Sequence, residues 1–325
     1  MRRSTNRSGP DRIRKVILCL GVGLCAAADS EAEGWREEHP QFSLDANRVE
    51  ITFSVTDRRG RFVTLRRDDF EVYEDQRPQN IIEFTSESEL PLRLALLLDT
   101  SNSVRDRFGA VQAAAAKFVS SCLRPGYDQA MLVSFDTSAE VVAPFREGKQ
   151  VAEEIQNLRP GGATSLYDAI DLTARRMTDA APEGRRYRFV IVIFGDGDDN
   201  ESLLTRDQAL EAAQRANTVI FAVSTSTQPF PTAGDRVLKY LASETGGTAL
   251  FPMSVEQFRH SFGSIAQELR HQHNILFRPE PTPTDEKYHV VEIRLKQPRG
   301  FTVRARKGYY VPAVLRSSVY GRKVR

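Results

Sequence analysis

The sequence has few cysteines and almost no net charge. Its longest apolar run lies near its start, and no later run is long enough for a membrane anchor. Only three of its 325 residues are cysteine, and two of them, Cys19 and Cys25, lie in a segment that we expect to be removed. Cys122 would then be the one remaining cysteine. An internal disulfide is therefore excluded, and the folded protein must be stable through its core alone.

The charge balance argues against one class of partner. The chain has 45 Lys and Arg residues and 43 Asp and Glu residues, which leave a formal charge of +2. A nearly neutral chain without basic and aromatic residues interleaved gives no reason to propose nucleic acid as a partner.

The first residues have the features of a secretory signal peptide. Basic residues precede an apolar run at residues 16–28, which is too short to span a bilayer and ends in small residues. We therefore expect a signal peptide over residues 1–28 and a secreted, periplasmic or cell-envelope protein. No second apolar run is long enough for a membrane anchor. An uncleaved anchor and a lipoprotein signal at Cys25 are the alternatives.

The hydrophobic pattern divides the rest of the chain into three parts. Residues 91–272 alternate between continuous apolar strands and amphipathic helices, which predicts an α/β, doubly wound (Rossmann-like), mostly parallel sheet covered on both faces. Short alternating stretches at 40–90 and 273–313 predict a small β domain built from the flanking amino- and carboxyl-terminal segments. Residues 314–325 form a basic tail.

Individual elements of the α/β part can be placed from their periodicity. Strands are expected at Leu94–Leu98, Ala130–Phe135, Phe189–Phe194 and Val219–Val223, with shorter strands at Glu140–Pro144 and Ala249–Phe251. One helix is expected to include Val111 and Cys122 on its apolar face. Further helices are expected at Val151–Leu158, Leu166–Met177, Asp207–Ala216, Arg236–Glu244 and Val255–Arg270.

Three loops that follow or border these strands carry oxygen ligands. The first offers Asp99, Ser101 and Ser103, the second Thr164 and the third Asp196. Ligands of open α/β sheets bind at the carboxyl ends of the strands. Hydroxyls and carboxylates without His or Cys describe a site for a hard cation, and two carboxylates fit Mg²⁺ with one coordination position left open. Mn²⁺ and Ca²⁺ are the alternatives.

Some residues of these loops also have a simpler interpretation. Ser103-x-x-Asp106 and Ser165-x-x-Asp168 match helix capping boxes, and Thr164 could be a turn hydroxyl. The simpler interpretations do not account for one kind of ligand recurring on three loops at the same sheet edge.

The three loops resemble a known family. DTSNS at 99–103, Thr164 in GGATSLYDAI and Asp196 in FGDGDDN are similar to the D-x-S-x-S, T and D elements of the metal-ion-dependent adhesion site in von Willebrand factor type A (VWFA) domains. The resemblance implies Ser101, Ser103 and Thr164 as direct ligands, with Asp99 and Asp196 acting mainly through water. A carboxylate of a partner protein would complete the metal's shell.

The sequence departs from the family pattern at two positions. Asn102 replaces a common loop glycine, and Gly195 stands where many members have threonine. Neither change removes a ligand. The flanking segments, such as VTDRRGRFVTLRRDDFEVYEDQ and DEKYHVVEIRLKQPRGFTVRARKGYYVP, resemble the exported acidobacterial VWFA-related group.

These observations favour an extracytoplasmic, adhesion-type protein-binding module that is not an enzyme. It would hold an acidic side chain of a protein or peptide through the metal. The alternatives are an envelope scaffold with a purely structural metal and a metal-dependent hydrolase. A hydrolase needs a nucleophile or base near the ion, and no histidine falls in the three loops. The histidines are His39, His260, His271, His273 and His289, of which we expect His271 and His273 to be exposed.

Overall fold

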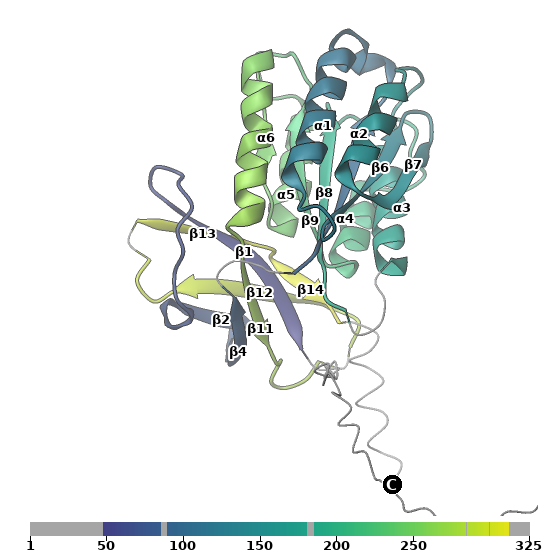
Figure 1. The fold of residues 1–325 in the computed structure, drawn as a ribbon. Helices are drawn as coiled ribbons and strands as arrows, with labels where there is room; N and C mark the ends of the chain where they lie inside the picture. The colour runs from purple at the N-terminus through teal and green to yellow at the C-terminus, as the bar shows by residue number, and fades with distance from the viewer. Residues whose placement is uncertain (1–47, 86–89, 181–184, 284, 299, 312–325) are drawn as a thin grey trace, which may run out of the picture. The chain divides into compact units, whose positions relative to one another are not determined.

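The computed structural model describes residues 48–85, 90–180, 185–283, 285–298 and 300–311 (Figure 1). The expected signal peptide and basic tail lie outside these residues. No helix in the described ranges is both long enough and apolar enough to cross a membrane.

The α/β part is built on a six-stranded sheet, which confirms the predicted fold class. Five strands run parallel, and β7 joins one edge in the antiparallel direction. In spatial order the strands are β10 (Ala249–Leu250), β9 (Thr218–Ser224), β8 (Arg188–Gly195), β5 (Leu92–Asp99), β6 (Gln129–Phe135) and β7 (Ala139–Arg146).

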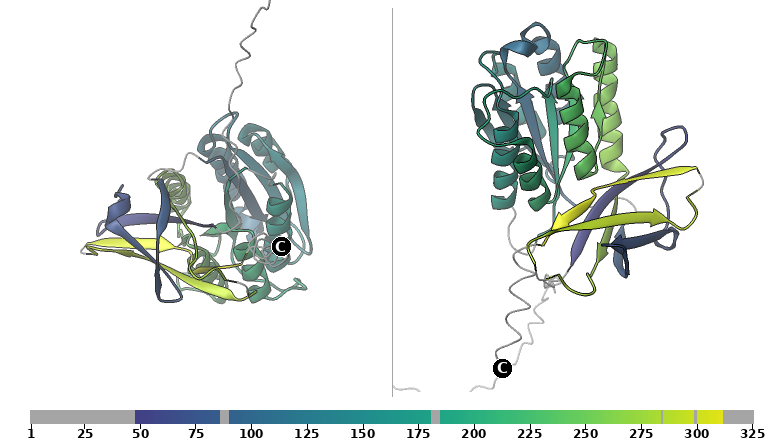
Figure 2. Two further views of the ribbon diagram at one scale, coloured as in Figure 1. Left: turned by 90° about the horizontal axis from the view of Figure 1, so that it is seen from below. Right: turned by 180° about the vertical axis from the view of Figure 1, so that it is seen from behind.

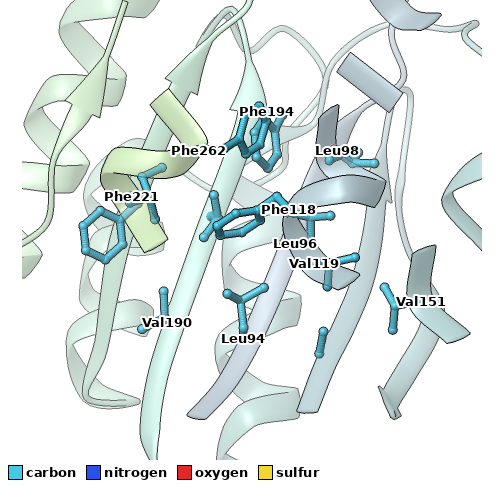
Figure 3. Close-up of a cluster of buried hydrophobic side chains, with 14 of the residues drawn as sticks. Leu94, Leu96, Leu98, Phe118, Val119, Val151, Val190, Phe194, Phe221 and Phe262 are labelled. Carbon is cyan, nitrogen blue, oxygen red and sulfur yellow. The ribbon is translucent and has the colours of Figure 1, made fainter. Parts of the chain in front are cut away.

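Helices cover both faces of this sheet (Figure 1; Figure 2). On one face lie α1 (Phe108–Cys122), α2 (Gly148–Asn157) and α6 (Val255–Arg270), and on the other α3 (Leu166–Asp179), α4 (Arg206–Arg215) and α5 (Ala233–Thr245). Strand β5 serves both cores because successive side chains point to opposite faces. Leu94, Leu96 and Leu98 pack with the first set of helices (Figure 3), and Ala95 and Leu97 with the second.

The flanking segments form two further antiparallel sheets of four strands, which agrees with the predicted β domain built from both flanks. One sheet has the order β13 (Phe301–Ala305), β1 (Val49–Asp57), β11 (His273–Phe277) and β4 (Ile81–Thr85). The other has the order β14 (Gly308–Tyr310), β12 (Tyr288–Leu295), β2 (Phe70–Glu74) and β3 (Arg77–Gln79). Side chains of both sheets, including Phe53, Val72 and Phe277, share one hydrophobic core.

Both sheets combine strands from the two ends of the chain. Strand β1 pairs with β11 on one side and β13 on the other, and β2 pairs with β12. Strand β11 is an element that the sequence pattern did not predict. All five of its residues are buried, so the expectation that His273 is exposed is wrong. Since α6 ends at Arg270, only His271 and Gln272 separate that helix from β11.

A buried carboxylate joins α6 to the first of these β-sheets. Glu268 accepts hydrogen bonds from Ser54 Oγ at 2.9 Å, Arg304 Nη1 at 2.7 Å and Thr248 Oγ1 at 3.2 Å. Its residue exposure is 5%. The last helix of the α/β part is therefore tied to strands β1 and β13 by side-chain contacts as well as by the chain.

Candidate metal centre

Strand β5 delivers Asp99 to the carboxyl edge of the sheet as a buried acid. Asp99 Oδ1 accepts a hydrogen bond from the Ser101 backbone N–H at 2.8 Å, and the residue is only 1% exposed. Asp99 Oδ2 is buried and has no hydrogen-bond partner. A buried carboxylate oxygen without a partner is costly, so its presence calls for a group to satisfy it.

The two serines of the first loop lie together. Their Oγ atoms are 2.8 Å apart, with Ser101 buried and Ser103 exposed. Ser103 lies inside a 3-10 helix over Asn102–Arg107 rather than at its start, so the capping-box interpretation of Ser103 is wrong. Both hydroxyls are free of the backbone and can turn lone pairs to a common ligand.

Asn102 fastens the first loop to the second. Its backbone N–H and its side-chain Nδ2 both donate to the Gly162 carbonyl, at 3.2 and 3.0 Å. Gly161 N–H donates back to the Thr100 carbonyl at 2.6 Å. The asparagine that departs from the family pattern therefore adds a side-chain bond between two of the predicted ligand loops.

The second loop is fastened in turn to the third. The Thr164 backbone N–H donates to Asn200 Oδ1 at 2.9 Å, and the Thr164 carbonyl accepts from the backbone of Asn200 and Glu201, each at 3.0 Å. The Thr164 side chain is left out of these bonds, and the residue is 5% exposed. The sequence did not predict this supporting role of Asn200, because no local pattern shows which distant backbone group an amide will bind.

Ser165 and Asp168 do not form the capping box that was their simpler interpretation. Ser165 precedes α3 but its side chain makes no cap hydrogen bond, and its buried Oγ is without a partner. The Asp168 carboxylate instead accepts from the backbone N–H groups of Leu203 and Leu204, each at 3.0 Å. Asp168 therefore holds the third loop, and Ser165 leaves an unsatisfied hydroxyl beside Thr164.

Two glycines allow the third loop to approach its neighbours. A Cβ at Gly195 would lie 3.0 Å from Asp99 Oδ2, so the missing side chain leaves room for that carboxylate. Gly197 has a φ of +82° and touches α5, where an added Cβ would lie 2.3 Å from the Gly234 carbonyl oxygen. Asp196 lies between these two positions and is half-buried.

Two acids on the predicted ligand loops have raised pKa values. Burial, with the nearby charge of Asp196 as a smaller cause, raises the pKa of Asp99 to about 7, against hydrogen bonds from Ser101 that lower it. Burial also raises the pKa of Asp198, with repulsion from Asp196 and Asp235 as the next causes. A positive charge at this point would relieve both effects.

The donor set suits a hard cation. Within the described ranges no group of three or more His, Cys, Asp or Glu side chains could hold a metal ion. The five predicted residues supply only two carboxylates, and their other oxygens are hydroxyls. Carboxylate and hydroxyl oxygens match Mg²⁺, Mn²⁺ or Ca²⁺ better than softer metals. The unpartnered Asp99 Oδ2 is the feature of the fold that fits such an ion.

One family model matches most of the first half of the α/β part. Residues 94–199 match the family model of the von Willebrand factor type A domain. No curated protein matches the chain.

Several solved structures are similar to the chain. The PilB minor pilin from Streptococcus sanguinis is 15% identical over 57% of this chain and 62% of its own, with a TM-score of 0.45. A von Willebrand factor type A protein from Catenulispora acidiphila is 12% identical over 83% of this chain and 74% of its own, with a TM-score of 0.49. Proximal thread matrix protein 1 from the mussel byssus, with a zinc-occupied MIDAS motif, is 14% identical over 59% of this chain and 48% of its own, with a TM-score of 0.47. The match therefore spans less than two thirds of the pilin and of the mussel protein.

Proposed function

We propose that this chain, whose residues 94–199 belong to the von Willebrand factor type A family, is an extracytoplasmic protein-binding module that holds a partner's carboxylate through a divalent cation. The family is generally one of protein-binding, metal-binding modules without enzymatic activity. The cation would be Mg²⁺, with Mn²⁺ or Ca²⁺ as alternatives, and its residues would be Asp99, Ser101, Ser103, Thr164 and Asp196.

The observation that carries this proposal is the orphaned Asp99 Oδ2. Three loops converge around this buried acid and are fastened to one another by Asn102 and Asn200. Such bonds hold the oxygens in place before a ligand arrives, which lowers the ordering cost of binding. The other oxygen of Asp99 is already bonded to Ser101, so the carboxylate cannot rotate freely toward another partner.

Each residue has a separate part in the proposed site. Ser101, Ser103 and Thr164 would contact the ion through their hydroxyls, while Asp99 and Asp196 would balance its charge mainly through water. The bound cation supplies a positive centre that attracts an acidic side chain. Because only neutral hydroxyls would contact the ion directly, it would remain electrophilic, and a carboxylate from outside would be favoured at its open position.

Calorimetric titration with Mg²⁺ and Mn²⁺ tests the site. We expect saturable binding to the native chain, and a loss of metal affinity of about 10–100-fold or more in Asp99→Asn, which keeps the shape of the side chain but removes its charge. The control is Asp106→Asn, an exposed acid in the same loop, which should bind metal within about twofold of the native chain. Equal affinity in native protein and Asp99→Asn would contradict the proposal.

The role of the carboxylate needs a second measurement. A fluorescent peptide of glycines with one central Asp should gain anisotropy with the protein in Mg²⁺ and lose it in chelator. A scaffold with a structural metal would instead show a metal-dependent rise in melting temperature and no binding of the peptide. That outcome would keep the metal site and reject the binding function.

A further inference from the structure

Exposed apolar side chains gather at the edge of the sheet that carries the candidate metal centre. Among the described residues of the α/β part, five large apolar side chains are exposed. They are Tyr127 at 45%, Leu203 at 94%, Phe230 at 78%, Phe251 at 41% and Met253 at 48%. All but Tyr127 lie in loops that follow the carboxyl ends of β8, β9 and β10. We call Leu203, Phe230, Phe251 and Met253 the apolar rim.

The two most exposed members are held on stiff backbone. Leu203 N–H is bonded to Asp168, and Leu203 lies two residues before the capping box in which Thr205 begins α4. Phe230 lies two residues before the corresponding box at Thr232, which begins α5, and is flanked by two prolines. Proline and capping bonds reduce the backbone freedom that binding would have to remove. Burying these side chains against a partner would therefore cost little backbone entropy.

The polar residues around the rim limit the partner's charge. Asp106, Asp198 and Glu201 are exposed on the loops of this edge; the exposed bases are Arg105 and, beside Phe230, Arg236, which donates to the Pro231 carbonyl. One carboxylate of a partner can bind the cation. A second carboxylate close to the metal loops would face Asp198 and Glu201, and like charges brought together oppose association.

We infer that the apolar rim binds apolar side chains of the same partner segment whose single carboxylate binds the cation, an inference that rests on the proposed function. The rim begins at β8, beside the metal loops, and extends over β9 to β10. Neighbouring strands are about 4.8 Å apart, so this span is about 10 Å. An extended peptide advances about 3.3 Å per residue, so the apolar residues lie about two to four positions from the acid, on one side of it.

Three fluorescent peptides of equal length test the inference. One has a single Asp among glycines, and the other two add Leu and Phe within four residues of the Asp, on its amino-terminal or its carboxyl-terminal side. In Mg²⁺ we expect one apolar peptide to bind about tenfold more tightly than the glycine peptide, with no binding in chelator. The double variant Leu203→Ser, Phe230→Ser should lose this advantage. Tyr127→Ser, at the opposite sheet edge, should keep it.

The outcomes separate the two claims. Metal-dependent binding of all three peptides with equal affinity would overturn the apolar rim and leave the proposed function intact. Metal-dependent binding of none would overturn both. An apolar advantage that persists in chelator, or that survives the double variant, would also reject the inference, because the contact would not then be shared between rim and metal.

Discussion

Glu268 offers the sharpest test of how the α/β part depends on the flanking sheets. We consider the substitution Glu268→Ala, which removes the acceptor shared by Ser54 of β1, Thr248 and Arg304 of β13. The Glu268 side chain is 6% exposed and that of Arg304 is 33% exposed. The substitution therefore removes a buried anion and leaves its cationic partner close to water.

The structure gives a magnitude for this loss. Removing one partner from a fully buried ion pair costs about 3–5 kcal/mol, because the other charge is left unpaired. Arg304 is a third exposed and can be rehydrated, and it keeps a hydrogen bond to Thr248 Oγ1 at 2.6 Å. We therefore expect a loss in free energy of unfolding of about 2–3 kcal/mol. For a domain of this size it corresponds to a melting temperature lower by roughly 5–10 °C.

Urea unfolding followed by circular dichroism measures the change. Gln267→Ala is the matched control, since its side chain is exposed on the neighbouring position of α6 and its removal should change the free energy by less than about 0.5 kcal/mol. A loss in Glu268→Ala no larger than in Gln267→Ala would refute the reasoning. It would mean that the Glu268 contacts with β1 and β13 add nothing to the covalent link between α6 and β11.

Two further predictions concern acid stability and a glycine contact. Burial raises the pKa of Asp128, but hydrogen bonds from the Arg124 side chain and from the backbone N–H groups of Leu92 and Arg124 outweigh it, and the net pKa is lowered. The stability that the Asp128 carboxylate contributes is present above its unfolded pKa and is lost as pH falls through its folded pKa. Asp128→Asn should therefore reduce the fall of the urea midpoint with pH below about pH 4. The same fall in the native chain and in the variant would contradict this prediction. At Gly197, the positive φ and the close Gly234 carbonyl predict a loss of about 2–4 kcal/mol in Gly197→Ala, measured by thermal unfolding. The control Gly263→Ala, in α6 with open space around it, should instead be stabilising by up to about 1 kcal/mol, and similar results for both would be evidence against the Gly197 contact.

Periodicity predicted the α/β part because its strands are covered on both faces. A continuous apolar run such as Leu94–Leu98, with a helical pattern after it, is typical of a parallel strand buried on both sides. Strand β11 escaped prediction because burial at every position, including His273 and Asn274, gives neither alternation nor a purely apolar run. The pairing of β1 with β11 joins residues more than 200 positions apart, and no local pattern specifies such a partner.

The sequence indicated the candidate ligand side chains but not the residues that hold their loops in place. Asp99, Ser101 and Ser103 stand at the end of a buried strand and place three oxygen ligands within five residues. Asn200 and Asp168 act on backbone groups of other loops, and only the folded chain brings those groups within reach. For the same reason Ser165 and Asp168, which satisfy a capping pattern in sequence, are used differently in the structure.

The interleaved sheets have a mechanical consequence. The first and last described strands, β1 and β14, both lie in the flanking β-sheets, and the whole α/β part leaves from β4 and returns through β11. A pull applied across Val49 and Tyr310 is carried by the β1, β11 and β13 ladders and by the core shared with β2 and β12. While those strands stay paired, the applied force does not pass through the α/β part. The loops of the candidate site are therefore expected to keep their geometry under load.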